Sequence, residues 1–285
     1  MRSAMLLIAG LLVAVSVHAA GMSDADYVAA MAAMHAHDVP VASPVAEVAP
    51  RRPVRGETVT YATVNGKPVR GYLSRPVDAK GSLPAIIVIH EWWGLNDNIR
   101  HMADRLAGEG YVALAVDLYG GKAATTPADA EALMKDVFAD NTAAEANLRQ
   151  TYAYLHNKAN ASRIGVIGWC FGGGWSLQTA LMLPDKIDAT VMYYGQPVDD
   201  VAALSKLKMP LIGFFGEEDH GITVKDVQTF SQALKQAGVK AEIHEYPRAG
   251  HAFANPSGKN YQANAARDAW RRTVNFLAHY LKGGA

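Results

Sequence analysis

The chain has little cysteine and no net charge. Its 285 residues include a single cysteine, and 27 basic residues balance 27 acidic ones. One cysteine cannot form an internal disulfide, so side-chain packing has to stabilise the fold. The balanced charge argues against a nucleic-acid-binding surface or a polybasic membrane patch. A small molecule is therefore the expected partner.

A convincing membrane span is also missing. The apolar run from Ala4 to Val17 is too short to cross a bilayer comfortably. Arg2 before this run and the small residues near Ala19 after it are typical of a secretory signal peptide. We therefore expect residues 1–19 to be a signal peptide and the mature protein to be periplasmic or secreted, with no stable membrane anchor after cleavage.

Residues 20–55 are interpreted as an N-terminal extension. A capping box from Ser23 to Asp26 predicts a short helix through Met34. The proline-rich residues 38–55 predict an extended linker, followed by one domain over residues 56–285. His35 and His37 have no third ligand near them in the sequence, so we expect both to be exposed and predict no metal site.

The rest of the chain has the pattern of an α/β fold. Alternating residues from Thr58, an Asn65-Gly66 turn and a second run from Val69 to Leu73 predict an antiparallel hairpin. Apolar strands then alternate with helices, which indicates a mostly parallel sheet with helices on both faces. The predicted strands are Ala85 to His90, Tyr111 to Leu118, Ile164 to Trp169, Ala189 to Tyr194, Leu211 to Phe215 and Ala241 to Tyr246. The predicted helices are Asn98–Gly108, Pro127–Phe138, Thr142–His156, Gly173 to Leu183, Thr223–Ala237 and Ala263–Leu281.

The only cysteine lies at the centre of Gly168-Trp169-Cys170-Phe171-Gly172, between a predicted strand and a predicted helix. A nucleophile elbow of the pattern G-x-S-x-G needs both glycines, because its strained turn leaves no room for side chains at those positions. The pattern predicts that Cys170 takes the place of the serine. The alternative is a buried, unreactive cysteine beside a glycine-rich helix start.

Two further strand ends supply the partners that a cysteine nucleophile needs. A base has to take the thiol proton, and a carboxylate has to orient that base. Cys170, Asp219 and His251 follow the order nucleophile, acid, histidine that enzymes with such an elbow use. By position alone, Glu217 and Glu218 compete with Asp219, which also fits a helix N-terminal carboxylate.

The elbow also predicts an oxyanion hole. The backbone N–H of Phe171 starts a helix, and the N–H of Trp92 follows a neighbouring strand. The side chains of Trp92, Trp93 and Trp169 either line an apolar substrate slot or pack in the core, and the sequence does not choose between these readings.

Taken together, these motifs resemble the dienelactone hydrolase family of the α/β-hydrolase superfold, from about Glu57 to Leu281. The resemblance implies a Cys-His-Asp triad whose acid is Asp219. It also implies that Glu91 contacts the thiol in the resting enzyme and helps to generate the thiolate. A carboxylate beside a thiol raises the thiol pKa, so Glu91 can accept a proton or restrain the thiol but cannot stabilise its anion. The motifs are Gly71-Tyr72-Leu73-Ser74-Arg75-Pro76, His90-Glu91-x-x-Gly94, Ala115-Val116-Asp117-Leu118-Tyr119, the elbow, and Gly250-His251-x-Phe253.

The chain departs from this family at the substrate carboxylate. Members that act on dienelactone clamp its carboxylate with two arginines, and Gly121 and Asn255 stand at those positions here. Neither residue can form a bidentate clamp, although Lys122 supplies a point charge. The weaker candidates for substrate contact are Trp93, Tyr119, Lys122, Trp169 and Asn255.

The sequence therefore predicts an enzyme that hydrolyses an ester, lactone or thioester through an acyl-cysteine, without metal or organic cofactor. Three alternatives remain open. They are a non-catalytic small-molecule binding protein on the same fold, a redox-active thiol protein, and a carboxymethylenebutenolidase, that is, a dienelactone hydrolase in the strict sense.

Overall fold

The computed structural model describes residues 22–40 and 48–283. The predicted signal peptide, residues 1–19, lies outside the described residues. Within them, every helix is too short or too polar to span a membrane.

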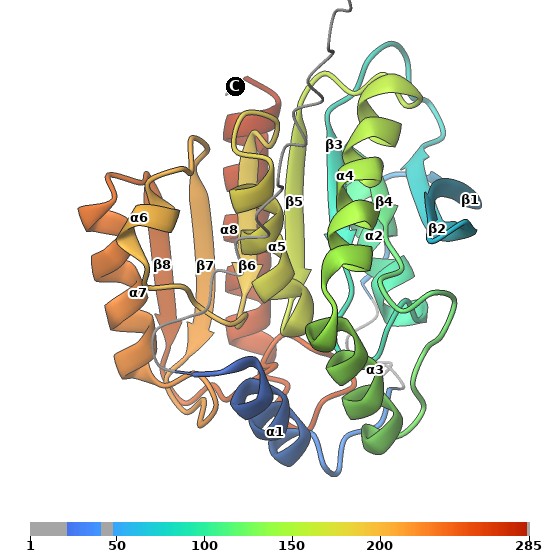
Figure 1. Cartoon of the computed structure of the whole chain (residues 1–285). Coiled ribbons are helices and arrows are strands. Elements are labelled where there is room, and N and C mark those ends of the chain that lie inside the picture. The colour runs from blue at the N-terminus through green and yellow to red at the C-terminus, as the bar shows by residue number, and fades with distance from the viewer. Residues whose placement is uncertain (1–21, 41–47, 284–285) are drawn as a thin grey trace, which may run out of the picture.

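An eight-stranded sheet with the order β1-β2-β4-β3-β5-β6-β7-β8 forms the centre of the molecule (Figure 1). β2 is antiparallel to both of its neighbours, whereas all pairs from β4 to β8 are parallel. This arrangement confirms the predicted fold, a mostly parallel sheet with an antiparallel hairpin at its edge. The strands are β1 (Val54–Val64), β2 (Lys67–Pro76), β3 (Ala85–Ile89), β4 (Val112–Ala115), β5 (Ile164–Trp169), β6 (Ala189–Tyr193), β7 (Leu211–Gly216) and β8 (Ala241–Tyr246).

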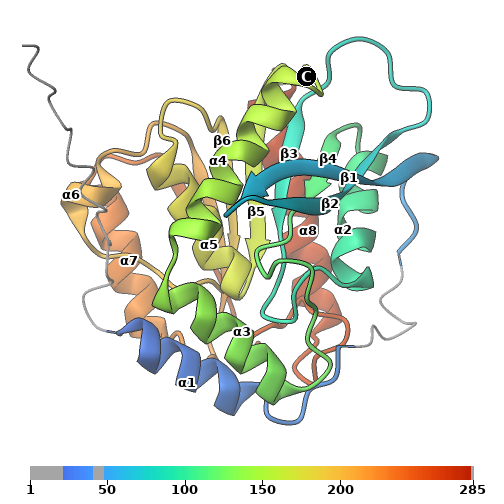
Figure 2. The ribbon, with the colours of Figure 1, turned by 45° about the vertical axis from the view of Figure 1, so that its right-hand side comes forward.

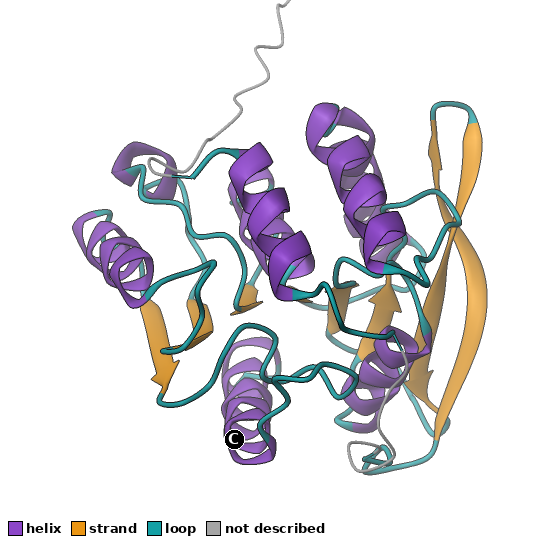
Figure 3. Cartoon of the chain, turned by 90° about the horizontal axis from the view of Figure 1, so that it is seen from below, coloured by secondary structure: helices purple, strands orange, loops and turns teal. Residues whose placement is uncertain are grey.

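Helices cover both faces of the sheet, as expected for parallel strands that are apolar throughout (Figure 3). α4 and α5 lie in front of the strands in Figure 2, and α2 and α8 lie behind them. The helices are α1 (Asp24–Met34), α2 (Asp97–Gly108), α3 (Pro127–Ala139), α4 (Thr142–Asn157), α5 (Phe171–Met182), α6 (Val201–Leu204), α7 (Val224–Gln236) and α8 (Ala263–Leu281).

Several elements differ from the sequence prediction. β1 begins at Val54 rather than at Thr58, inside the predicted linker, and α5 begins at Phe171 rather than at Gly173. β4 ends at Ala115, three residues before its predicted end at Leu118. The Tyr61 hydroxyl donates to the Asp117 carbonyl and accepts from its N–H, and Asn147 also donates to that carbonyl. Side chains therefore form hydrogen bonds with backbone groups that would pair with a neighbouring strand if β4 were longer. The four-residue α6 was not predicted.

The N-terminal helix α1 packs against the domain instead of projecting from it. The Ser23 side chain caps it by accepting from the N–H of Asp26 at 3.1 Å. Its buried face consists of Tyr27, Val28 and Met31. In both Figures 1 and 2, α1 lies beside α3 beyond the carboxyl ends of the parallel strands. This edge of the sheet is where α/β proteins bind ligands.

Candidate active site

Cys170 lies at the turn between β5 and α5, with a φ of 53° and a ψ of −119°. Such a positive φ is rare for a residue with a side chain and is a form of strain found at functional sites. A Cβ added to Gly172 would lie 2.4 Å from the carbonyl oxygen of His90. The turn therefore has the local geometry that the elbow pattern predicts, and it lifts Cys170 to the end of the sheet.

This contact makes Gly172 sensitive to a single added methyl group. We expect Gly172→Ala to lower the free energy of unfolding by about 1–3 kcal/mol, because the clash involves backbone that can move only with β3. Gly174→Ala on the same helix is the control, since its Cβ would come no closer than 3.4 Å to a neighbour. Urea unfolding of both variants measures the difference, and equal midpoints would contradict the steric account.

His251 and Asp219 form a buried pair beside this turn. The Nδ1 of His251 lies 2.7 Å from Oδ2 of Asp219, and both side chains are fully buried. The other carboxylate oxygen of Asp219 accepts the N–H groups of Gly221 and Ile222, each at 2.9 Å. These bonds fix the carboxylate, which in turn fixes the imidazole. Glu217 and Glu218, the competing acids, are exposed.

The opposite edge of the His251 ring faces the cysteine. A ring nitrogen of His251 and the Sγ atom of Cys170 lie within 4.8 Å of each other, and Nδ1 is already bound to Asp219. Within the part of the chain that the structure describes, the Nε2 of His251 is buried and has no hydrogen-bond partner. The structure thus brings Cys170, His251 and Asp219 together at one end of the sheet, with the histidine between the other two.

The electrostatics of the site favour a thiolate. Burial alone would raise the pKa of the Cys170 thiol, but His251 and His35 lower it to about 6. Burial opposes a charge on His251, yet Asp219 and Cys170 raise the pKa of its imidazole to about 10. Between these values the pair shares one proton, which stays on the histidine.

This coupling predicts how the thiol titrates. We expect the ultraviolet absorbance of the Cys170 thiolate to appear as the pH rises through about 6, well below the value near 8.5 of a free cysteine. A depressed pKa means that the thiolate persists above this midpoint and is protonated below it. The difference in absorbance between wild type and Cys170→Ala measures the titration. A midpoint above about 8 would contradict the ion pair.

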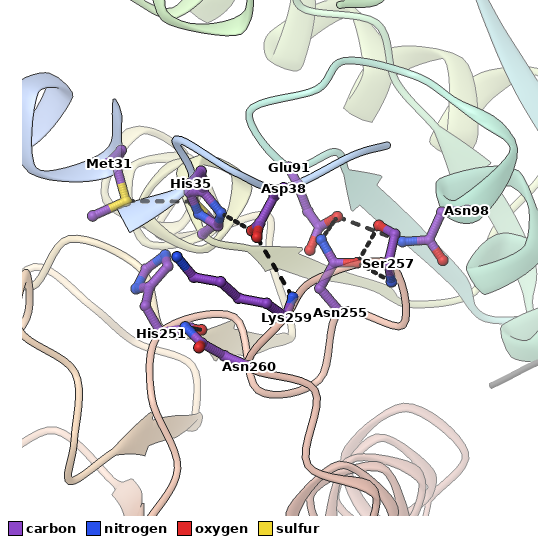
Figure 4. Close-up of polar contacts among 11 residues, drawn as sticks. Met31, His35, Asp38, Glu91, Asn98, His251, Asn255, Ser257, Lys259 and Asn260 are labelled. Atoms are coloured by element: carbon purple, nitrogen blue, oxygen red, sulfur yellow. Dashed lines mark hydrogen bonds and ion pairs between the residues drawn. The ribbon is translucent and has the colours of Figure 1, made fainter. Parts of the chain in front are cut away.

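A second histidine lies next to the thiol, and the sequence analysis placed it wrongly. His35, at the end of α1, is only 2% exposed rather than free in solvent. Its Nε2 lies 4.0 Å from the Sγ of Cys170, and its Nδ1 lies 2.6 Å from Oδ2 of Asp38 (Figure 4). Burial disfavours a charge on this ring, but the bond to Asp38 and the nearby Cys170 raise its pKa. His37 is exposed, as expected.

α1 also covers the cysteine with apolar groups. The Sδ of Met31 lies 3.6 Å from the Sγ of Cys170. The His35 ring packs on Trp92 at 4.7 Å and against His251 at 5.3 Å between ring centroids. As a result, Cys170 is only 1% exposed. The described structure is therefore a closed form of the site.

Glu91 is buried near the thiol and is held by two asparagines. Its Oε2 accepts from Asn255 at 2.9 Å and from Asn98 at 3.5 Å, and in the described residues no hydrogen bond joins it to Cys170 (Figure 4). Burial and the nearby thiolate raise the pKa of Glu91 to about 8. Asn255 therefore holds Glu91 in the described structure, and the His35 imidazole lies beside the thiol.

The two predicted oxyanion donors come from the elbow and from the segment after β3. Phe171 is the first residue of α5, and Trp92 follows β3. Across residues 22–40 and 48–283, the N–H groups of Phe171 and Trp92 donate no hydrogen bond to another residue. Free N–H groups near a nucleophile can stabilise a developing oxyanion.

The remaining predicted substrate contacts separate into core and surface. Trp93 is buried against Trp92, and Trp169 packs on Tyr193 at 5.5 Å, so both belong to the core. Tyr119 is buried against Phe171, and burial and the Cys170 thiolate raise the pKa of its hydroxyl. Lys122 is exposed and lines a separate hollow of about 230 Å³. Of these residues, Tyr119 is close enough to Cys170 for its hydroxyl to respond to the thiolate.

The chain is similar to known proteins over most of its length. The profile of the dienelactone hydrolase family matches residues 69–281. The chain belongs to this family. It is 37% identical to Protein usf of Aquifex pyrophilus, over 76% of this chain and 96% of that protein. It is 32% identical to an Aquifex aeolicus protein provisionally named carboxymethylenebutenolidase, with the same coverage. A crystal structure titled as a provisional dienelactone hydrolase from Klebsiella pneumoniae covers 80% of this chain and all of its own, at 29% identity and a TM-score of 0.73.

As a member of the dienelactone hydrolase family, the protein is a hydrolase that acts on esters. The matched region begins at residue 69, so α1 and the pair formed by His35 and Asp38 lie outside it. Sequence reasoning missed this pair, although histidine and aspartate three residues apart at a helix end were visible in the sequence. What the sequence did not reveal is the docking of α1 on the nucleophile.

Proposed function

We propose that the protein hydrolyses an ester, lactone or thioester through a covalent acyl-cysteine formed at Cys170. The observation that carries the proposal is the buried, unpartnered Nε2 of His251 that faces the Cys170 Sγ, on a ring fixed by Asp219. A thiol activated by a histidine that a carboxylate orients is the arrangement used in nucleophilic catalysis.

In the proposed mechanism, the Cys170 thiolate attacks the carbonyl carbon while the N–H groups of Phe171 and Trp92 donate to the oxyanion. Protonated His251 gives its Nε2 proton to the departing alkoxide or thiolate, which leaves an acyl-cysteine. The neutral Nε2 then takes a proton from water, and the resulting hydroxide attacks the thioester. Collapse of this second intermediate releases the acid and restores the ion pair.

The substrate is proposed to lack the carboxylate of a dienelactone. Asn255 is engaged by Glu91, and Lys122 is exposed at a separate hollow, so no cationic clamp comes from these positions. Because Cys170 is 1% exposed, we also propose that α1 shifts when substrate enters. A cavity of about 640 Å³ is lined in part by Met34 of α1 and by His251, and we propose it as the entry route once α1 shifts.

Intact-protein mass spectrometry after mixing with p-nitrophenyl acetate tests the proposal. We expect an acetyl adduct and p-nitrophenol turnover in wild type, and neither in Cys170→Ala. An adduct on wild type without turnover would support the acyl-cysteine but show that water does not release it, which would contradict hydrolysis. No adduct and no turnover in folded wild type would favour a binding protein on the same fold. The same spectra test the proposed export, because a secreted chain would begin near Ala20.

The orienting acid gives a further prediction. Asp219→Asn is expected to lower kcat by roughly 10⁴-fold, because an amide neither holds the required tautomer nor stabilises the protonated imidazole. Glu218→Gln is the matched control, since Glu218 is adjacent in sequence but exposed. Steady-state kinetics with p-nitrophenyl acetate measure both variants. A larger loss in Glu218→Gln than in Asp219→Asn would move the acid to Glu218.

A further inference from the structure

A triad explains one of the two histidine-carboxylate pairs beside Cys170 and leaves the other without a role. One ring nitrogen of His35, one of His251 and the Sγ of Cys170 all lie within 4.8 Å of one another, and all three residues are buried. One base is enough for acyl transfer. The pair formed by His35 and Asp38 is therefore available for a different function.

The two rings are arranged as metal-binding histidines are. Each presents Nε2 to the thiol and binds a carboxylate through Nδ1, at 2.6 Å to Asp38 and 2.7 Å to Asp219. Histidine ligands almost always have such an outer carboxylate or carbonyl, which fixes the tautomer and increases the basicity of the ligating nitrogen. Nε2 of His251 has no other partner among the described residues. Both nitrogens are thus turned toward one point beside the sulfur.

The separations suit a small tetrahedral ion. Zinc bonds of about 2.3 Å to sulfur and about 2.0 Å to nitrogen place ligand atoms roughly 3.5 Å apart. Sγ of Cys170 and Nε2 of His35 are 4.0 Å apart, so a shift of about half an ångström would bring this pair to the zinc geometry. Because His35 belongs to the end of α1, a small movement of this helix supplies the shift.

The donor set selects the class of metal. A thiolate with two imidazoles favours zinc and related borderline transition-metal ions, whereas magnesium and calcium prefer oxygen ligands. We propose that His35, Cys170 and His251 bind one Zn²⁺-class divalent ion, and that this ion holds α1 closed over the nucleophile. On binding, the metal–sulfur bond forms and the proton shared by Cys170 and His251 leaves to solvent, with no change of oxidation state.

A bound ion would block both groups on which hydrolysis depends. The thiolate electron pair would be engaged by the metal, and Nε2 of His251 could not transfer a proton. Metal binding would therefore inhibit the enzyme, and His35 would determine the affinity for the metal. This inhibition rests on the proposed function, whereas the binding site does not.

Binding is measured on the full chelator-treated protein, with Zn²⁺ titrated against a chromophoric chelator and Co²⁺ used as the spectroscopic probe. Wild type is expected to bind one ion per chain and to show a thiolate-to-cobalt charge-transfer band that Cys170→Ala lacks. His35→Ala is expected to weaken Zn²⁺ binding by about 100-fold or more, and Asp38→Asn by about 10–100-fold. His37→Ala, two residues away and exposed, is expected to bind as wild type.

Two results would overturn the metal site. One is no Zn²⁺ binding by wild type, and the other is equal affinity in wild type and His35→Ala once circular dichroism shows both to be folded. Ester turnover without metal binding would refute the metal site and leave the hydrolase intact. A cobalt band without any turnover would support the metal site and count against the hydrolase. Inhibition by Zn²⁺ is expected to need about 100-fold more metal in His35→Ala than in His37→Ala.

Discussion

Cys170→Ala is expected to reduce kcat/KM for p-nitrophenyl acetate by roughly 10⁶-fold, the size of effect seen when the nucleophile of a triad is removed. Alanine cannot attack the carbonyl, so only binding and oxyanion stabilisation remain, and water becomes the nucleophile. The thiol is the atom toward which the elbow and both histidines are arranged. Among the described residues near Cys170, no other side chain is a nucleophile activated in this way.

The measurement is steady-state hydrolysis with enough enzyme to detect a small residual rate, and urea unfolding of the same samples shows whether the variant is folded. The sulfur is a small part of a large core, so a folded variant is expected. Retention of more than about one hundredth of the wild-type kcat/KM would assign the reaction to another nucleophile.

His251→Gln is expected to cause a loss of similar size, roughly 10⁶-fold, because the variant loses the group that protonates the leaving group and activates water. His35 cannot replace His251. His35 and its partner Asp38 follow α1, which has to shift when substrate enters. His35→Gln is expected to cost far less, because His251 still stabilises the thiolate in that variant.

The comparison of the two glutamine variants decides which histidine is the base. Both rings lie beside the same sulfur and each has one carboxylate partner, so the variants are closely matched. The values of kcat and KM are determined separately for each variant, because loss of a group that acts on the bound substrate lowers kcat. If His35→Gln were the more damaging variant, the base would be His35 and its acid Asp38.

Most of the fold could be predicted because its signals are local. Strands such as β5 and β7 are continuous apolar runs, and α8 has the same bounds in the sequence prediction and in the structure. The glycines of the elbow were equally readable, since their reason is contact with adjacent backbone. In β4 the prediction failed because Tyr61 and Asn147, distant in sequence, bind the backbone of Asp117.

The candidate site was predictable only where each residue follows a strand. Cys170, Asp219 and His251 satisfy this rule, and the parallel sheet brings them together. His35 comes from a helix before the sheet, so its burial depends on how α1 docks, which no periodicity encodes. Asn255 likewise looked like a substrate contact, and only the three-dimensional structure shows that its amide binds Glu91.

The cover that α1 places on Cys170 also affects the chemical lifetime of the protein. A thiolate with a depressed pKa is the form that peroxides convert to sulfenic acid and then, irreversibly, to higher acids. Here the sulfur is 1% exposed beneath Met31 and His35. An oxidant therefore meets the same barrier as a substrate, and the reactive sulfur is vulnerable only while the helix is displaced. In peroxide, enzyme without substrate should consequently keep its activity longer than enzyme that is turning over substrate.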